Sequence, residues 1–149
     1  MPQREGGFLI AKIHQVAGRI FAQKLKERQI DINPAQGRIL FVLWQQDNIP
    51  IHELAQKTAL GKSTLTSMLD RLETGGYLRR VPSPDDRRKI FIRRTDKDRA
   101  LQNLYNQVST EMTALFYEGL SEQEIDVFED CLRRIFEHLS AVETNKDTM

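Results

Sequence analysis

Hydroxyl and cationic side chains gather on one predicted helix, between a turn at Gly61 and a glycine pair at 75–76. Small hydroxyls can approach base edges closely, and lysine or arginine can contact phosphates, so this mixture suits DNA binding. When the helix is considered alone, a solvated surface helix explains the same residues equally well. The candidate DNA contacts on it are Lys62, Ser63, Thr64, Thr66, Ser67 and Arg71.

A second cationic cluster follows on a predicted β-hairpin. Residues 77–81 and 89–93 read as two strands, and residues 82–86 have turn composition. Arginine on a hairpin tip can enter a narrow minor groove, and Asp86 is placed to orient the guanidinium of Arg88. The alternative is a solvated charged turn, which the helices upstream make the weaker interpretation. The candidate DNA contacts on the hairpin are Asp86, Arg87, Arg88 and Lys89.

Two short helices joined by a tight turn must position these side chains. Ile51, Leu54 and Ala55 form the apolar stripe of a helix over residues 51–58, and Gly61 suits a turn that needs a positive φ. Helix, turn, helix and hairpin in this order predict a winged helix-turn-helix. The fold class is therefore mainly α with a small β-hairpin wing. The core face of the second helix consists of Leu65, Met68, Leu69 and Leu72.

Local signals also mark where further helices begin. Asn33, Pro34 and Gln36 predict a capping box with proline in the first helical position, on a helix that ends near residue 47. Ser121 and Glu124 predict a second capping box. Residues 49–50, just after the first of these helices, are a candidate third strand of the wing sheet.

Long amphipathic helices flank the winged region on both sides. The first spans residues 8–28 and carries two adjacent apolar stripes, and two more follow Thr95 and Ser121. We expect this apolar surface to form a homodimer interface, because readers of DNA gain affinity and register from twofold symmetry. An intramolecular helical bundle is the alternative. Cys131 flanks one stripe and is interpreted as a core or interface thiol.

The charge distribution supports a DNA-binding region joined to a region that does not bind DNA. The net charge of the 149 residues is only +1, but residues 62–99 carry eleven Lys and Arg against six Asp and Glu. Residues 100–149 carry three against ten. A basic middle and an acidic C-terminal part are typical of such a division.

Several other classes of protein are disfavoured. No transmembrane stretch or secretory segment is apparent, and a single cysteine suits a reducing cytoplasm, so we expect a cytoplasmic protein without membrane contact. His14, His52 and His138 lie on three different predicted helices, without metal-ligand spacing. No nucleophile, acid–base pair or cofactor motif stands out, so we expect no catalytic residue, no metal and no cofactor.

The motifs together resemble the multiple-antibiotic-resistance regulator (MarR) family of transcription factors. The resemblance rests on residues 32–40 (INPAQGRIL), 54–55, 61–78 (GKSTLTSMLDRLETGGYL) and 83–95 (SPDDRRKIFIRRT). The family's D-x-R wing motif falls on Asp86 and Arg88, and its threonine on Thr95. Two positions depart from the family pattern: Arg94 replaces a leucine and Asp98 a glycine. Thr95 and Asp98 instead resemble a capping box, which predicts that the next helix still starts there.

The resemblance implies a single MarR-like domain over residues 1–149. Its winged lobe occupies 33–95, and its helical dimerisation region 8–30 and 96–142. The implied function is a homodimeric transcriptional regulator, specifically a repressor, that binds a pseudo-palindromic double-stranded operator. The alternative is a winged-helix module for protein interaction, against which the adjacent cations at 87–89 argue.

The family resemblance also implies a small anionic or aromatic effector that releases the repressor. In the family such compounds often bind in the crevice between the helical region and the winged lobe. On the first helix, Lys12, His14 and Arg19 are the candidate ligand-binding residues. Solvated helix positions are an equally good interpretation of these three.

Overall fold

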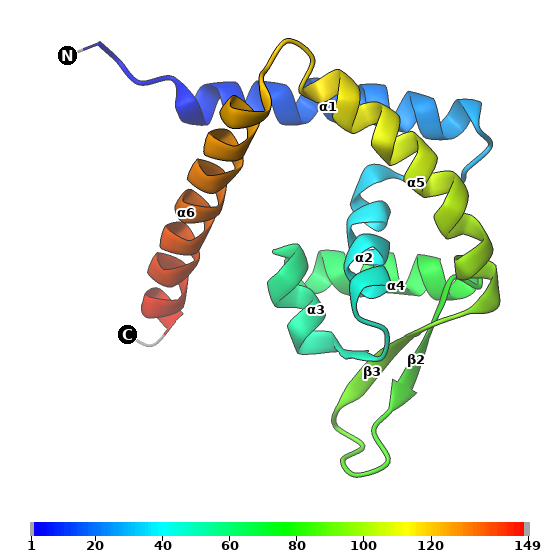
Figure 1. Ribbon diagram of the computed structural model, residues 1–149. Helices are drawn as coiled ribbons and strands as arrows, with labels where there is room; N and C mark the ends of the chain where they lie inside the picture. Colours follow the sequence, from blue (N-terminus) through cyan, green and yellow to red (C-terminus); the bar gives the residue numbers. More distant parts are fainter. Residues whose placement is uncertain (1, 148–149) are drawn as a thin grey trace. The chain divides into compact units, whose positions relative to one another are not determined.

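The computed structural model describes residues 2–147 and contains six α-helices and one three-stranded sheet in that part of the chain (Figure 1). The predicted fold class is confirmed. In chain order the elements are α1 (Gly6–Glu27), α2 (Pro34–Gln45), β1 (Ile49–Pro50), α3 (Ile51–Thr58), α4 (Lys62–Thr74), β2 (Leu78–Pro82), β3 (Ile90–Arg94), α5 (Asp96–Phe116) and α6 (Glu122–Asp147).

The predicted start of α2 and end of α4 are confirmed in atomic detail. Asn33 Oδ1 accepts from the Gln36 backbone N–H at 2.8 Å, and Gln36 Oε1 accepts from the Asn33 N–H at 3.0 Å. At the end of α4, Gly76 has a φ of +84° and the Tyr77 N–H donates to the Leu72 carbonyl at 2.9 Å. These bonds form a Schellman motif, which needs a residue in the left-handed conformation after the helix.

The turn between α3 and α4 differs from the prediction. Ala59, not Gly61, adopts the left-handed conformation, with a φ of 58°, while Gly61 is extended at the N-cap of α4 with a φ of −65°. Thr58 explains how an alanine is held there. Its hydroxyl donates to the Leu54 carbonyl at 2.7 Å and accepts from the Leu60 N–H, which satisfies the helix end locally.

The wing is an antiparallel sheet with the strand order β1-β3-β2. Leu78 of β2 lies opposite Arg94 of β3, and Pro82 opposite Ile90, so the hairpin closes through the residues between them. Pro82, which has turn composition, ends β2 instead of starting the turn. The predicted third strand at residues 49–50 is present and pairs with β3. Figure 1 shows the β2–β3 hairpin projecting beyond the helices of the winged lobe.

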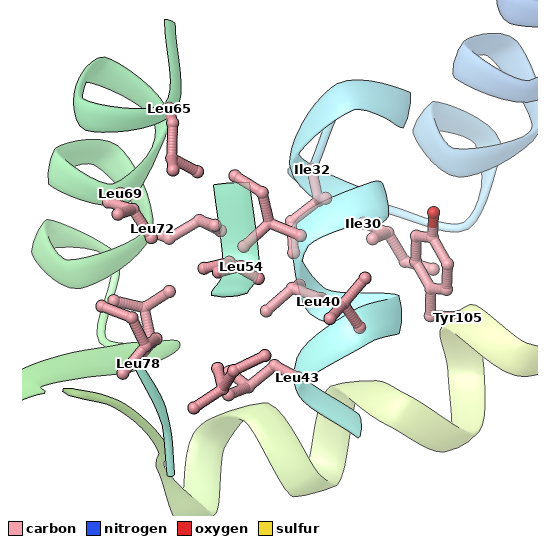
Figure 2. Packing of buried hydrophobic residues seen from close by; sticks show 14 of the residues in the cluster. Ile30, Ile32, Leu40, Leu43, Leu54, Leu65, Leu69, Leu72, Leu78 and Tyr105 are labelled. Atoms are coloured by element: carbon pink, nitrogen blue, oxygen red, sulfur yellow. The ribbon is translucent and has the colours of Figure 1, made fainter. Parts of the chain in front are cut away.

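The core joins α2, α3, α4 and the sheet to one face of α5 (Figure 2). Of the core face predicted for α4, Leu65, Leu69 and Leu72 are at most 3% exposed, and Met68 is half-buried against the same core. Tyr105 of α5 packs edge-on against Phe21 and Trp44, with ring centroids 5.6 and 5.1 Å apart. The hydroxyl of Tyr105 lies so close to Gly37 that a Cβ there would collide with it. Glycine is thus required on α2 by packing, not by backbone conformation.

The chain divides into two compact units, the first ending at Met112 and the second starting at Thr113. In the second unit, the Ser121 and Glu124 capping box is confirmed by reciprocal bonds of 2.9 and 3.1 Å. There Tyr117 donates to Glu129 Oε2 at 2.6 Å, and burial, reinforced by this bond, raises the pKa of Tyr117 to about 12. Cys131 is exposed, so it is not a core thiol of the single chain.

Candidate nucleic-acid interface

The outer face of α4 presents the predicted hydroxyl groups together. Lys62, Ser63, Thr66, Ser67 and Asp70 line a shallow depression of about 690 Å³. The Thr66 hydroxyl donates to the Lys62 carbonyl at 2.9 Å, so its oxygen remains able to accept a hydrogen bond from outside. Thr64 is also exposed on α4. Because successive turns of α4 carry small side chains here, a ligand in this depression can approach the helix backbone closely.

Arg80 of β2 ties the wing to α4, a connection that the sequence did not reveal. Its Nη2 lies 2.6 Å from Asp70 Oδ1 and 2.8 Å from Glu73 Oε1, and its backbone N–H donates to Glu73 Oε2 at 2.9 Å. The backbone and side-chain bonds from Arg80 lower the pKa of Glu73, and the bond to Glu73 raises the pKa of Arg80. The available signal was the alternation of the strand, which puts Arg79 and Arg80 on opposite faces.

The hairpin tip contains the predicted pair of Asp86 and Arg88. Asp86 Oδ1 accepts from the Arg88 backbone N–H at 3.1 Å and from Arg88 Nε at 3.2 Å. The bonds from Arg88 lower the pKa of the Asp86 carboxyl, which holds it ionised. The Arg88 side chain is nevertheless 91% exposed, so Asp86 orients the guanidinium without covering it. Arg87 and Lys89 beside it are exposed.

The two residues that depart from the family pattern form a buried ion pair. Arg94 Nε lies 2.6 Å from Asp98 Oδ2, with side-chain exposures of 13% and 0%. The other oxygen of Asp98 accepts from the indole N–H of Trp44 at 2.8 Å, and Arg94 Nη2 donates to Gln102 at 2.5 Å. This network joins the end of the wing to α2 and α5.

The capping box predicted for Thr95 and Asp98 is therefore only half formed. The Thr95 hydroxyl accepts from the Asp98 N–H at 3.2 Å, but the Asp98 carboxylate is directed to Arg94 and Trp44 instead of returning to the Thr95 backbone. Thr95 also donates to the Gly76 carbonyl at 2.6 Å. A buried cation next to the carboxylate outweighs a cap at an exposed helix end.

A cavity of about 670 Å³ lies between the end of α1, the segment before α2 and the end of α4. Lys26 and Arg71 line it together with Tyr77, so Arg71 faces this cavity as well as flanking the outer surface of α4. The candidate ligand residues do not line it. Lys12, His14 and Arg19 are exposed on α1, and Lys12 Nζ lies 5.1 Å from the ring centre of Phe8.

Within 2–147, no three His, Cys, Asp or Glu side chains are close enough to hold a metal ion. Over the same range, no helix combines the length and the apolar character needed to cross a bilayer.

Comparison with known proteins places this geometry in context. The model of the MarR family matches residues 32–90. The regulator TtmR of Methylorubrum extorquens is 33% identical over 57% of this chain, but the match covers only 43% of that protein. The transcriptional repressor IacR of Pseudomonas putida is 25% identical over 91% of this chain and 80% of its own length. A cysteine-to-serine mutant of MarR from Escherichia coli, crystallised with operator DNA, is 27% identical, with a TM-score of 0.78 over 87% of this chain and 91% of that one.

Proposed function

Residues 32–90 form a MarR family domain, and from this premise we propose that the protein is a DNA-binding transcriptional regulator. The observation that carries the proposal is the connection of two exposed groups, the hydroxyl face of α4 and the Arg88 tip, through Arg80. A helix in a major groove and an arginine in the adjacent minor groove need a fixed separation. The ion pairs of Arg80 with Asp70 and Glu73 provide it.

Within this proposal Lys62 and Arg71 contact phosphates, and Ser63, Thr66 and Ser67 approach base edges. The test begins by selecting bound sequences from a randomised duplex pool with the wild-type protein. Replacing a phosphate contact should weaken specific and non-specific binding alike. Replacing a base contact should relax the preference at one position of each half-site. Unchanged preference for both Thr66→Ala and Ser67→Ala would show that α4 presents a different face.

Arg88 should supply the minor-groove contact. Arg88→Ala should lower the affinity for the selected duplex by about 1–3 kcal/mol, as loss of a specific groove contact does. Asp86→Ala should cause a smaller loss, because it removes only the group that orients the guanidinium. Arg4→Ala, which removes an exposed arginine from the segment before α1, is the control. Equal affinities for Arg88→Ala and wild type at the same salt concentration contradict a wing contact with DNA.

We further propose that the protein is a homodimer. Large apolar side chains are 38–64% exposed on α1, among them Phe8, Ile13, Val16 and Ile20, and others are exposed on α6. A single soluble chain rarely exposes so continuous a stripe without a partner. Ile13→Glu would bury an unpaired charge in such an interface and should dissociate the dimer. Gln15→Glu adds the same charge to α1 outside the apolar stripe. Sedimentation that finds the wild type monomeric at micromolar concentration contradicts the proposal.

The regulator should act as a repressor that a small organic anion releases. The cavity beside Lys26 and Arg71 has a volume in the range of ligand sites. Its lining combines these two cations and one carboxylate, Asp31, with amide and apolar side chains. A ligand there would contact α1 and α4 together, and so would change the position of α4 relative to α1. Reciprocity requires that ligand and operator weaken each other by the same factor.

Calorimetry with salicylate, in the presence and absence of the selected duplex, tests the effector proposal. Lys26→Gln should weaken salicylate binding if the cavity is the site, whereas Lys12→Gln should weaken it if the first part of α1 is. Equal salicylate affinity with and without DNA rules out release by this compound. Activation of transcription by the bound protein would overturn the repressor assignment while leaving DNA binding intact.

A further inference from the structure

The outer face of the wing sheet carries two arginines directly opposite each other. Arg79 of β2 pairs in register with Arg93 of β3, and both side chains are exposed. Like charges at opposed positions of neighbouring strands destabilise a sheet. Among the residues described, 2–147, no acidic side chain forms an ion pair with either arginine. Within these residues no carboxylate therefore offsets the repulsion between the two arginines.

The inner face of the same sheet is arranged in the opposite way. Arg80 pairs with Asp70 and Glu73, and Arg94 pairs with the buried Asp98. Each of the two inner arginines is thus neutralised by carboxylates from a neighbouring helix. The contrast means that the chain provides counter-charges where the sheet meets its helices, and leaves the outer pair available to an external anion.

Asn48 holds one of the outer arginines in place. Its Oδ1 accepts from Arg93 Nε at 2.9 Å, and its φ of 57° is one that asparagine tolerates better than most residues. The bond uses Nε, and within the described part of the chain the two terminal nitrogens of Arg93 make no hydrogen bond to protein. The guanidinium is therefore oriented, with its terminal edge free to donate.

The outer face continues into the cationic hairpin tip. The Ser83 N–H donates to the Lys89 carbonyl at 2.8 Å, which extends the strand pairing by one residue beyond Pro82 and Ile90. By strand alternation Lys89 shares its face with Phe91 and Arg93. At about 3.3 Å per residue, Lys89 lies roughly 13 Å from Arg93 along the strand. One face therefore runs from the tip to the base of the wing, cationic at Lys89 and again at Arg79 and Arg93, with the apolar pair Val81 and Phe91 between them.

We propose that the outer face of the wing, through Arg79 and Arg93, binds the DNA backbone beyond the groove that the hairpin tip enters. The proposal rests on the proposed function. Side chains on opposed residues start about 5 Å apart, and the Arg93 guanidinium is directed toward Asn48, on the side of β3 away from β2. The two arginines therefore present two separate cations to one stretch of backbone. DNA is the occupant because the face is continuous with Lys89 and the tip, which the same duplex would contact. The inferred contact does not recognise any base, and it extends the length of duplex that the protein covers.

The test compares Arg79→Gln/Arg93→Gln with wild type on a duplex that the wild type selects from a randomised pool. Hydroxyl-radical footprinting should show that the outermost backbone protection disappears in the variant, with protection at the central grooves retained. The slope of log K against log salt should become shallower by about 0.9 for each phosphate that the variant no longer neutralises. Arg4→Gln/Arg133→Gln removes the same charge from exposed positions outside the wing and is the matched control.

A second duplex, trimmed at the inner limit of that outermost protection, completes the design. Wild type and variant should bind the trimmed duplex equally, because it lacks the phosphate that distinguishes them. Identical footprints and salt slopes for variant and wild type on the long duplex overturn the inference and leave the proposed function standing. Selection of no sequence by the wild type refutes the proposed function itself. Thermal denaturation checks folding, and removing the opposed charges should not lower the melting temperature.

Discussion

Replacing Asp98 by asparagine should be among the most destabilising single changes in this chain. Asp98 is fully buried, and its two oxygens lie 2.6 Å from Arg94 Nε and 2.8 Å from Trp44 Nε1. Asparagine keeps nearly the same shape and can still accept from Trp44, but it leaves the guanidinium of Arg94 largely buried without its counter-charge. Breaking a buried pair in this way costs about 3–5 kcal/mol. Loss of Asp98 should therefore remove a large part of a stability that is typically about 5–15 kcal/mol.

Urea denaturation at one fixed protein concentration measures this effect, since the concentration matters if the folded state is a dimer. The informative comparison includes Arg94→Leu, Asp98→Gly and the double change, which restores the residue types of the family pattern. Because the pair acts as a unit, the double variant should lose less free energy than the two single variants lose in sum. A decrease below about 1 kcal/mol for Asp98→Asn, or additive effects of the single changes, would refute the reasoning.

Three further perturbations test the helix packing and the wing. Gly37→Ala should destabilise by about 1–3 kcal/mol, because its Cβ collides with Tyr105; an unchanged urea midpoint contradicts this. Asn33→Ala should cost about 1 kcal/mol through loss of the capping box, measured in the same way. Arg80 lowers the pKa of Glu73, so the stability that Glu73 contributes is present above pH 4.5 and is lost as the pH falls through the lowered pKa. The difference in melting temperature between wild type and Glu73→Gln should accordingly shrink in acid.

Features that depend on a few neighbouring residues could be predicted from the sequence. The capping box at Asn33 and the Schellman motif at Gly76 each use bonds within six residues, so composition and spacing suffice to find them. The same holds for the bonds between Asp86 and Arg88, which are two residues apart. The candidate DNA contacts themselves remain predictions, because exposure on α4 and on the hairpin is compatible with both binding and solvation.

Features that depend on tertiary partners could not be predicted. One local feature was also missed: the positive φ at Ala59 is supported by its neighbour Thr58, whereas glycine preference alone points to Gly61. Asp98 has the position of a capping residue in sequence, but its carboxylate has a better partner in Arg94, and that choice depends on burial. Sequence spacing shows which hydrogen bonds a side chain can make with its neighbours in the chain. Burial in the folded structure determines which of the possible partners it bonds.

The contacts at the end of α4 indicate which elements a conformational change would move together. The Lys97 ammonium bonds the Gly75 carbonyl at 2.6 Å and lies 4.6 Å from the ring centre of Tyr77, and the Thr95 hydroxyl bonds the Gly76 carbonyl. The start of α5 thus holds the end of α4. Because Arg80 also fixes the wing to α4, these two elements and the start of α5 should move together as one body. If the effector proposed above reorients this body, the contacts of α4 and of the wing with DNA should weaken together.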